Sequence, residues 1–340
     1  MPTTILALKK LFNKKYFFTS SFLLIGVGLW LSTPIYQTFS GQIFGTSYKV
    51  VVFAPRIITY VSRYQVHIDE TFNQINTTFS TYTDDSELMR LNQSKGNQGA
   101  PVSDLLFTHF KRSIVLFRQL NGAWDPTLAP LSRQFNLQTS GGRQNDNRQP
   151  VYGFDNITLK QPNIIQKGAD VIEFDFSSNA KGLAVDAIVQ NLMNPLITGL
   201  FVDIGGEVRT VGTKQQELPW RVGIQSPDLS QTPIAIIELS NQSMASSGNY
   251  LNYVTRKNKN IGHILDPRTL APVSHNLVSI SIIANDCFTA DTLATGLFVM
   301  GKEEAATWLS RHPTFPALLI TEENGALTSH FYNGFDKYTN

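Results

Sequence analysis

Two residues in the last fifth of the sequence, Asp291 and Thr295, have the types and the spacing of a metal site. Residues 290–301 (ADTLATGLFVMG) predict a helix, in which a spacing of four places a carboxylate and a hydroxyl on one face. Such oxygen ligands suit a hard cation such as Mg²⁺, which usually also keeps waters and substrate phosphates in its shell. The structural alternative is that Asp291 belongs to the helix start and that Thr295 bonds back to its own helix.

A possible general base, His263, stands just before the turn Asp266-Pro267-Arg268-Thr269. Neutral imidazole suits proton abstraction near pH 7. Asp266 and Arg268 are near enough in sequence to orient the ring. The alternative is a histidine with a purely structural role.

Three further polar groups follow predicted strands. Lys181 lies between a predicted strand and a predicted helix, where it can neutralise a phosphate, because helix N-termini attract anions. Asp175 can accept a hydrogen bond from a ribose or a ring N–H. The pair Gly205-Gly206 can form a small nest of N–H groups for an anion. The structural alternatives are a solvated lysine, an aspartate that caps a turn, and a hairpin turn.

The elements that must position these residues are short and irregular in order. The apolar pattern predicts strands at residues 48–54, 171–176, 199–204, 220–224, 234–239 and 278–284, with two more between 315 and 332. Helices are expected at residues 57–79, 84–91, 103–120 and 183–193, after Pro126, and through Asp291 and Thr295. Residues 41–45 are expected to be a flexible joint, and residues 137–150 a surface loop. Without a strict βαβ repeat, the order favours an α+β fold.

Composition excludes several classes of function. The chain has 340 residues, a formal net charge of +2 and one cysteine, Cys287. No basic stripe with interleaved aromatic residues suggests nucleic-acid binding, and no Cys/His cluster offers a zinc site. The GxSxG, HExxH, GxGxxG and Walker patterns are absent, so serine hydrolases, zinc proteases, Rossmann enzymes and P-loop NTPases fit poorly.

The N-terminus has the pattern of a membrane segment. Four lysines between residues 9 and 15 precede an apolar run at residues 17–35, which is about long enough to cross a bilayer. Lysines before the run and few charges after it place the N-terminus in the cytoplasm and the rest of the chain outside. Residues 1–40 are therefore expected to be an anchor, with a cleaved signal as the alternative, and residues 41–335 to be the functional domain.

Several segments, taken in order, resemble the ApbE family of flavin transferases. They are FGTSY (44–48), FSTYTDDSELMRLN (79–92), GAWDPTLAPL (122–131), DFSSNAKGLAVD (175–186), VDIGGE (202–207), ASSGNY (245–250), GHILDPRT (262–269) and ADTLATGLFVMG (290–301). The resemblance implies an α+β flavin-transferase fold with mixed or antiparallel sheets and packed helices. It also implies Mg²⁺-dependent transfer of FMN from FAD to a threonine or serine hydroxyl of an acceptor protein, with release of AMP.

The resemblance also implies roles for individual residues. Asp291, Thr295 and the backbone carbonyl of Ser178 match the family's metal ligands, and His263 matches the base that takes the acceptor's proton. Phe44 matches a residue that lines the nucleotide site. The positions matching the family's FAD contacts are Tyr82, Ala123, Trp124, Asp125, Asp175, Lys181 and Leu265.

Three departures from the family pattern concern loop shape. Leu270 replaces the usual glycine after DPRT, Asn249 stands where SGDY is usual, and Leu183 replaces an aromatic residue after Lys-Gly. Two other activities stay open: an FAD pyrophosphatase, with water in place of the acceptor hydroxyl, and a non-catalytic flavin-binding or delivery protein. The expected location is a bacterial inner membrane with the catalytic domain on the periplasmic side. The expected acceptor is a subunit of a membrane redox complex.

Overall fold

The fold is built around one antiparallel sheet. The computed structural model describes residues 26–134, 149–228, 230, 232–249, 253–256, 259–262 and 264–339. Its largest sheet has eight strands in the order β1-β2-β6-β7-β10-β15-β16-β17, and each strand runs antiparallel to its neighbours. The strands are β1 (Pro34–Ile43), β2 (Thr46–Pro55), β6 (Gly199–Ile204), β7 (Glu207–Gly212), β10 (Ser243–Gly248), β15 (Leu277–Ala284), β16 (Ala317–Glu323) and β17 (Ala326–Tyr332).

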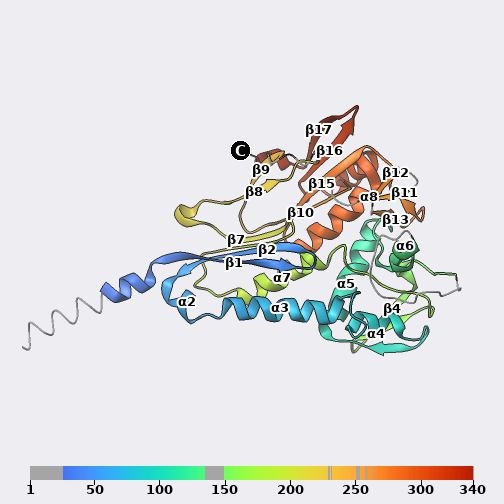
Figure 1. Cartoon of the computed structure of the whole chain (residues 1–340), viewed down its shortest axis with the longest axis horizontal. Coiled ribbons are helices and arrows are strands. Elements are labelled where there is room, and N and C mark those ends of the chain that lie inside the picture. The colour runs from blue at the N-terminus through green and yellow to red at the C-terminus, as the bar shows by residue number, and fades with distance from the viewer. Residues whose placement is uncertain are drawn as a thin grey trace, which may run out of the picture.

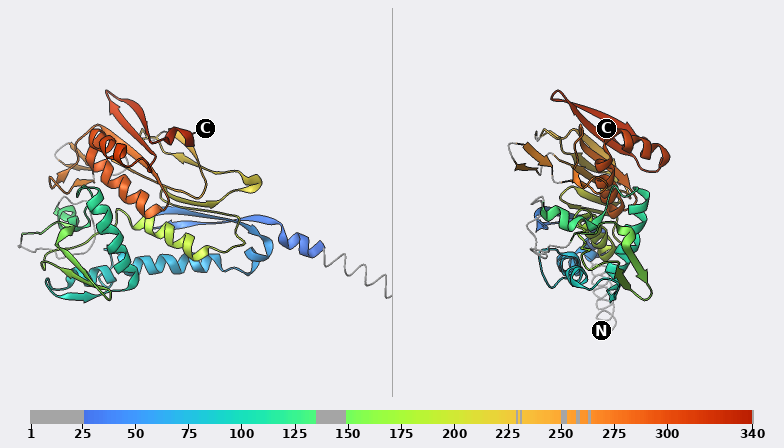
Figure 2. Two further views of the ribbon diagram at one scale, coloured as in Figure 1. Left: turned by 180° about the vertical axis from the view of Figure 1, so that it is seen from behind. Right: turned by 90° about the vertical axis from the view of Figure 1, so that its right-hand side faces the viewer.

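Helices cover one face of this sheet (Figures 1 and 2). Helix α7 packs on β6 and β7, helix α8 packs on β10 and β15, and helix α3 lies against α7. The helices are α2 (Arg56–Val61), α3 (Tyr64–Phe79), α4 (Glu87–Gln93), α5 (Asp104–Gln119), α6 (Ala129–Gln134), α7 (Ala180–Leu192) and α8 (Cys287–Arg311). Short 3₁₀ turns are η1 (Pro126–Leu128), η2 (Phe154–Asn156), η3 (Gln215–Glu217) and η4 (Phe335–Tyr338).

Smaller sheets complete the fold. They comprise β3 (Gly99–Pro101), β4 (Ile157–Lys160) and β5 (Ile164–Lys167); β8 (Trp220–Ile224) and β9 (Ala235–Leu239); β11 (Tyr253–Arg256) and β12 (Lys259–Gly262); and β13 (Leu265–Asp266) and β14 (Ala271–Pro272). The β8–β9 pair and η4 cover the face of the large sheet that the helices leave open. The predicted α+β class is therefore confirmed.

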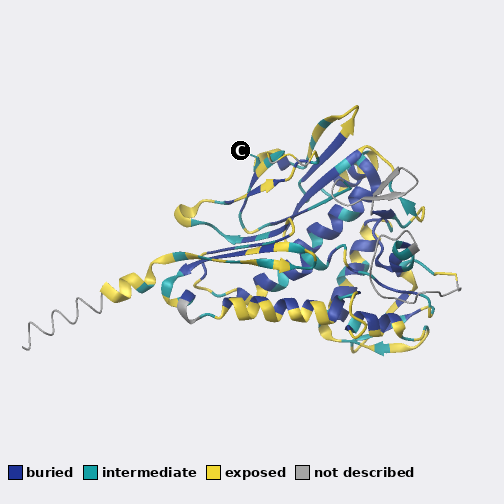
Figure 3. Ribbon diagram, in the orientation of Figure 1, coloured by how far each residue is buried: buried dark blue, intermediate teal, exposed yellow. Residues whose placement is uncertain are grey.

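The period of two along each strand explains the two hydrophobic layers. On β15, Ile282 packs into the large core with the helices, whereas its neighbour Ile283 packs on the β8–β9 side. The adjacent pair Leu318 and Leu319 on β16 divides in the same way. Figure 3 shows the result: the inner strands of the sheet and most of α8 are buried, whereas the edge strands β1 and β17 are exposed or half-buried and the outward side of α3 is exposed.

The expected flexible joint at residues 41–45 is wrong. Strand β1 runs through Gly41 to Ile43, and only Phe44 and Gly45 turn before β2 begins. Both turn residues have positive φ values, 51° and 74°, as a tight two-residue hairpin requires. Because β1 starts at Pro34, the sheet also includes residues that the sequence pattern assigned to the N-terminal segment.

The expected strand at residues 171–176 is also wrong. The segment is buried and apolar, but it pairs with no strand among the described residues. The side chain of Asn92 bonds to both the N–H and the carbonyl of Phe174, and the Asp175 N–H donates to Pro126 O at 2.8 Å. Side-chain and loop groups thus satisfy this backbone in place of a ladder.

The helix expected at residues 57–79 is divided into α2 and α3 by Ser62 and Arg63. Helix boundaries elsewhere follow local signals: Ser86 caps α4 and Ser103 caps α5, each accepting a backbone N–H three residues on.

The N-terminal prediction is not tested by the fold. Among the residues that the structure describes, no helix is long and apolar enough to span a bilayer. Residues 26–32 are helical, whereas residues 17–25 of the apolar run and the four lysines before it lie outside the described range. The expected loop at residues 137–150 lies mostly outside that range as well.

One buried histidine in the core predicts a pH-dependent stability. The ring of His109 packs between Phe79, Phe176 and Phe288 at centroid distances of 4.4–5.1 Å. Neither ring nitrogen has a hydrogen-bond partner among the described residues. Burial, with a smaller contribution from Arg112, lowers the pKa of His109 from 6.5 to about 3.

We expect His109→Leu to flatten the acid side of the stability profile. Below pH 6.5 the unfolded chain binds a proton at His109 that the folded chain refuses until about pH 3. The wild type should therefore lose about 2 kcal/mol more than the variant between pH 6.5 and 5. Urea unfolding at several pH values measures this difference, with the exposed His67→Leu as the control. Parallel profiles for wild type and His109→Leu would contradict the prediction.

Candidate active site

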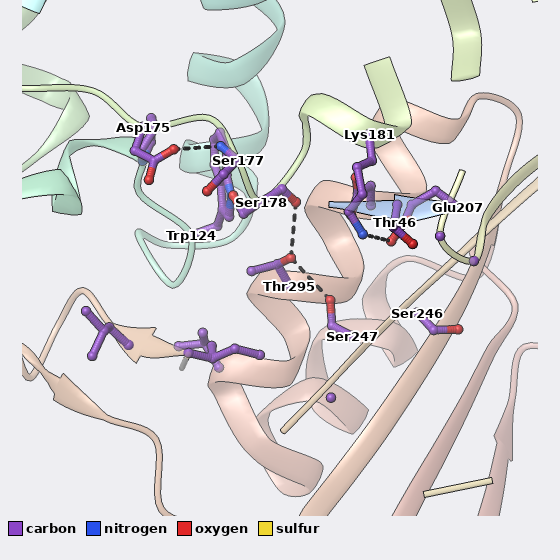
Figure 4. A pocket seen from close by; sticks show the side chains of 18 of the residues that line it. Thr46, Trp124, Asp175, Ser177, Ser178, Lys181, Glu207, Ser246, Ser247 and Thr295 are labelled. Atoms are coloured by element: carbon purple, nitrogen blue, oxygen red, sulfur yellow. Dashed lines mark hydrogen bonds and ion pairs between the residues drawn. The ribbon is translucent and has the colours of Figure 1, made fainter. Parts of the chain in front are cut away.

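A cavity of about 690 Å³ lies where the N-terminal turn of α7, the middle of α8 and the ends of β6, β7, β8 and β10 meet (Figure 4). Segments from residue 46 to residue 299 contribute to its walls. The cavity brings together nine of the site residues predicted from the sequence: Ala123, Trp124, Asp125, Asp175, Ser178, Lys181, Leu265, Asp291 and Thr295. Residues far apart in the chain therefore share one site.

The three predicted metal ligands line this cavity together. The Thr295 hydroxyl is 3.5 Å from the carbonyl oxygen of Ser178 and 3.2 Å from the hydroxyl of Ser247 (Figure 4). Asp291, one turn earlier on α8, is only 3% exposed. Its Oδ2 accepts the N–H of Gly182 on α7 at 2.9 Å.

The structural alternative for this pair does not hold. Helix α8 begins at Cys287 and is capped by Asp286, so Asp291 does not cap it. Thr292 makes the back-bond to its own helix, at Phe288 O, whereas Thr295 bonds to Ser178 and Ser247 outside the helix.

The environment of Asp291 suits a cation. Burial raises the pKa of Asp291 to about 6, although Lys181 and the Gly182 N–H act to lower it. The positive charge and the N–H group near Asp291 therefore do not fully compensate for the burial of its ionised carboxylate. In the part of the chain that the structure describes, no group of three or more His, Cys, Asp or Glu side chains could hold a metal. One carboxylate, a hydroxyl and a carbonyl leave room for waters and phosphate oxygens, as Mg²⁺ requires.

Lys181 has a partner that the sequence did not indicate. Its ammonium group pairs with Glu207 Oε1 at 2.7 Å, and Glu207 is 3% exposed (Figure 4). Burial acts to lower the pKa of Lys181, but the carboxylates of Glu207 and Asp291 outweigh it and raise the pKa. Burial also raises the pKa of Glu207. The solvated-lysine alternative is therefore excluded.

Glu207 follows the Gly205-Gly206 turn of the β6–β7 hairpin, so the hairpin alternative for this glycine pair is confirmed. The turn nevertheless lines the cavity. The side chain of Asp203 accepts the Gly206 N–H at 2.9 Å and stabilises the turn. Oε2 of Glu207 has no hydrogen-bond partner within the described residues.

Trp124, Asp125 and Asp175 line another part of the cavity, and hydrogen bonds hold their side chains in place. The Trp124 indole N–H donates to Ser178 Oγ at 2.9 Å, so Trp124 contacts the residue whose carbonyl oxygen is a predicted metal ligand. Asp125 caps η1 by accepting the N–H and hydroxyl of Thr127 at 2.8 and 2.7 Å. Asp175 accepts the Ser177 N–H at 2.8 Å, so it does cap a turn. Burial raises the pKa of both carboxyl groups.

Three predicted site residues are not placed in the cavity. Phe44 is a turn residue that packs edge-on against Phe72 at 5.9 Å, although the next residues, Thr46 and Ser47, do line the cavity. Tyr82 is 68% exposed. His263 lies outside the described residues, so its role as the base stays a prediction.

A helix-covered antiparallel sheet holds a large, partly buried pocket whose oxygen ligands suit a cation and whose walls suit an extended polar ligand. The chain belongs to the ApbE family, whose model matches residues 44–319.

Individual relatives agree with this assignment. The FAD:protein FMN transferase of Haemophilus influenzae is 33% identical over 306 residues, which cover 85% of this chain and 88% of that protein. The enzyme of that name from Vibrio cholerae is 30% identical over 307 residues, with 88% and 91% covered. The solved structure of flavin transferase ApbE from Vibrio cholerae superposes with a TM-score of 0.77 at 30% identity, covering 90% of this chain and 99% of that one.

Proposed function

We propose that this chain transfers FMN from FAD to a threonine or serine hydroxyl of an acceptor protein and releases AMP, with Mg²⁺ bound at Asp291, Thr295 and the Ser178 carbonyl. The observation that carries the proposal is the cavity itself, which brings together nine separately predicted residues, the three oxygen ligands among them. The names of the relatives support the proposed reaction. The three oxygen ligands support the proposed Mg²⁺.

The chain's own residues account for binding and charge. Asp291, Thr295 and Ser178 present oxygens on one side of the cavity, and Lys181 presents a positive charge beside them. Mg²⁺ bound there would neutralise the pyrophosphate as its bridging bond breaks. Trp124 lines the cavity and is fixed by its bond to Ser178, so the flavin ring can contact Trp124 beside a metal ligand.

The hydroxyl of the acceptor needs a base, because it is a weak nucleophile until its proton is accepted. We assign this role to His263 on the strength of the family resemblance. Its neighbours Ile264 and Leu265 line the cavity, so the chain reaches the site at this point. Arg268 bonds to Asp266 and Glu304 and anchors the turn that follows.

We also propose that the N-terminal segment before β1 contributes a membrane anchor, that the catalytic domain faces the periplasm, and that the acceptor is a subunit of a membrane redox complex. The lysines before the apolar run support the orientation. Because β1 begins at Pro34, a truncation at residue 41 would remove most of an edge strand. The full chain in detergent is therefore the right sample.

Mass spectrometry tests the reaction. The full chain is incubated with FAD, Mg²⁺ and an acceptor carrying a Ser/Thr flavinylation motif, beside an acceptor whose motif hydroxyl residue is alanine. We expect the first acceptor alone to gain one FMN, with an equal amount of AMP. Free FMN and AMP without a labelled acceptor would establish a pyrophosphatase instead. Intact FAD bound to the protein would establish a binding protein.

A further inference from the structure

Helices α7 and α8 cap each other with carboxylates. On α7, the Gly182 N–H donates to Asp291 Oδ2 of α8 at 2.9 Å. One turn later on α7, Asp186 accepts the N–H groups of Cys287 and Phe288, the first two residues of α8, at 2.9 Å each. The four N-terminal N–H groups of a helix lack partners within the helix, so each carboxylate satisfies donors of the opposite helix.

Asp186 also binds a third element. Arg209 of β7 donates to Asp186 Oδ1 at 2.6 Å, and the side chain of Asp186 is only 11% exposed. Strand β7 begins with Glu207, the partner of Lys181. One carboxyl group therefore ties together α7, α8 and β7. Helix α7 carries Lys181, helix α8 carries the two side-chain metal ligands, and strand β7 carries Glu207.

We infer that Asp186 is a positioning residue for the metal site. It holds the first turn of α8 against α7, and this contact sets where Asp291 stands, four residues further along α8. Asp186 does not line the cavity, so it acts through the helix and not on the ligand. The inference rests on the proposed binding of a divalent cation by Asp291 and Thr295.

A second carboxylate on the same helix terminus provides a matched control. Asp286 caps α8 by accepting the N–H and hydroxyl of Thr289, and it pairs with Arg112 of α5 at 2.6 Å. Asp286 thus resembles Asp186 in charge, in its helix contact and in its arginine partner. It differs in that it is the N-cap residue of α8 itself and that its side chain is 32% exposed, against 11% for Asp186. The helix of its arginine partner, α5, also contributes no residue to the cavity.

The test compares Mn²⁺ affinity with stability in the full chain. Asp186→Asn and Asp286→Asn are both expected to lower the melting temperature, because each places an amide NH2 group where a carboxylate oxygen accepts a hydrogen bond from α8. Only Asp186→Asn is expected to weaken Mn²⁺ binding in calorimetric titration, by about tenfold, as loss of a residue that orients a ligand does. Equal Mn²⁺ affinities for wild type and Asp186→Asn would overturn the inference and leave the metal site standing. Absence of Mn²⁺ binding to the wild type would overturn both.

A milder variant covers the case in which Asp186→Asn does not fold. Asp186→Glu keeps the charge beside Arg209, but its longer side chain moves the carboxylate away from the N–H groups of Cys287 and Phe288. We expect a several-fold loss of Mn²⁺ affinity. Unchanged affinity in this folded variant would equally overturn the inference.

Discussion

Asp291→Asn is expected to abolish Mn²⁺ binding and to reduce FMN transfer by about a thousandfold or more, because the site loses its only predicted charged ligand. Asparagine has nearly the same shape, and its oxygen can still accept the Gly182 N–H. The backbone of α7 and α8 should therefore remain in place. Rates of acceptor labelling and calorimetric titration with Mn²⁺ measure the two effects.

The same substitution is expected to stabilise the protein when no metal is present. Burial raises the pKa of Asp291 from 3.8 to about 6, so folding favours the protonated group. The associated stability is complete below about pH 4 and is lost as the pH rises through 6. At pH 7.5 the ionised side chain thus destabilises the fold in the absence of metal, and asparagine avoids this effect.

Melting curves in EDTA and in Mg²⁺ separate the two roles of Asp291. In EDTA the variant should melt at or above the temperature of the wild type, and in Mg²⁺ only the wild type should gain. A variant that is inactive and also less stable in EDTA would show that Asp291 is a structural residue. The metal assignment would then fail.

Local signals in the sequence were enough to predict most of the helices and strands near the site. Strands β6 and β8 have the predicted bounds, because alternating apolar residues and flanking turn residues both mark them. Strand β10 was missed, because its sequence SMASSG has small and polar residues and no apolar alternation. It forms through its long-range pairing with β15, where Ser246 and Ser281 bond at 2.7 Å.

The parts of the site that could not be predicted are contacts between segments far apart in the sequence. Lys181 was recognised as a cation at a helix start, but nothing in either segment indicated that it meets Glu207 at 2.7 Å. The bonds from Asp186 to the start of α8 were equally hidden, since they join residues about a hundred positions apart. Residue types indicated the chemistry of the site, and only the packing of α7 on α8 and β7 showed which groups hold each other.

Gly182→Ala is expected to lower Mn²⁺ affinity and FMN transfer by about a hundredfold, because α7 and α8 touch at this glycine. A Cβ atom there would lie 2.6 Å from the Cys287 carbonyl oxygen and 2.8 Å from Asp291 Cβ. The carbonyl belongs to the helix backbone, so it cannot swing aside as the end of a side chain can. The helices must separate, and the bond from the Gly182 N–H to Asp291 must lengthen.

Two opposing terms act on the stability of Gly182→Ala. Alanine favours a helix over glycine by about 1 kcal/mol. Overpacking of a tight contact costs about 1–3 kcal/mol, and loss of the bond to Asp291 adds to it. We therefore expect a net decrease in the free energy of unfolding together with the loss of metal affinity.

Gly296→Ala is the matched control, since Gly296 lies on α8 directly after Thr295. Its Cβ would also come close to a neighbour, Leu120 Cδ1 at 2.6 Å, but that atom is the end of a flexible side chain. This variant should keep Mn²⁺ affinity within a few-fold of the wild type. If Gly182→Ala binds Mn²⁺ as tightly as Gly296→Ala, the contact between α7 and α8 does not set the position of Asp291. The position of Asp291 would then depend on α8 alone.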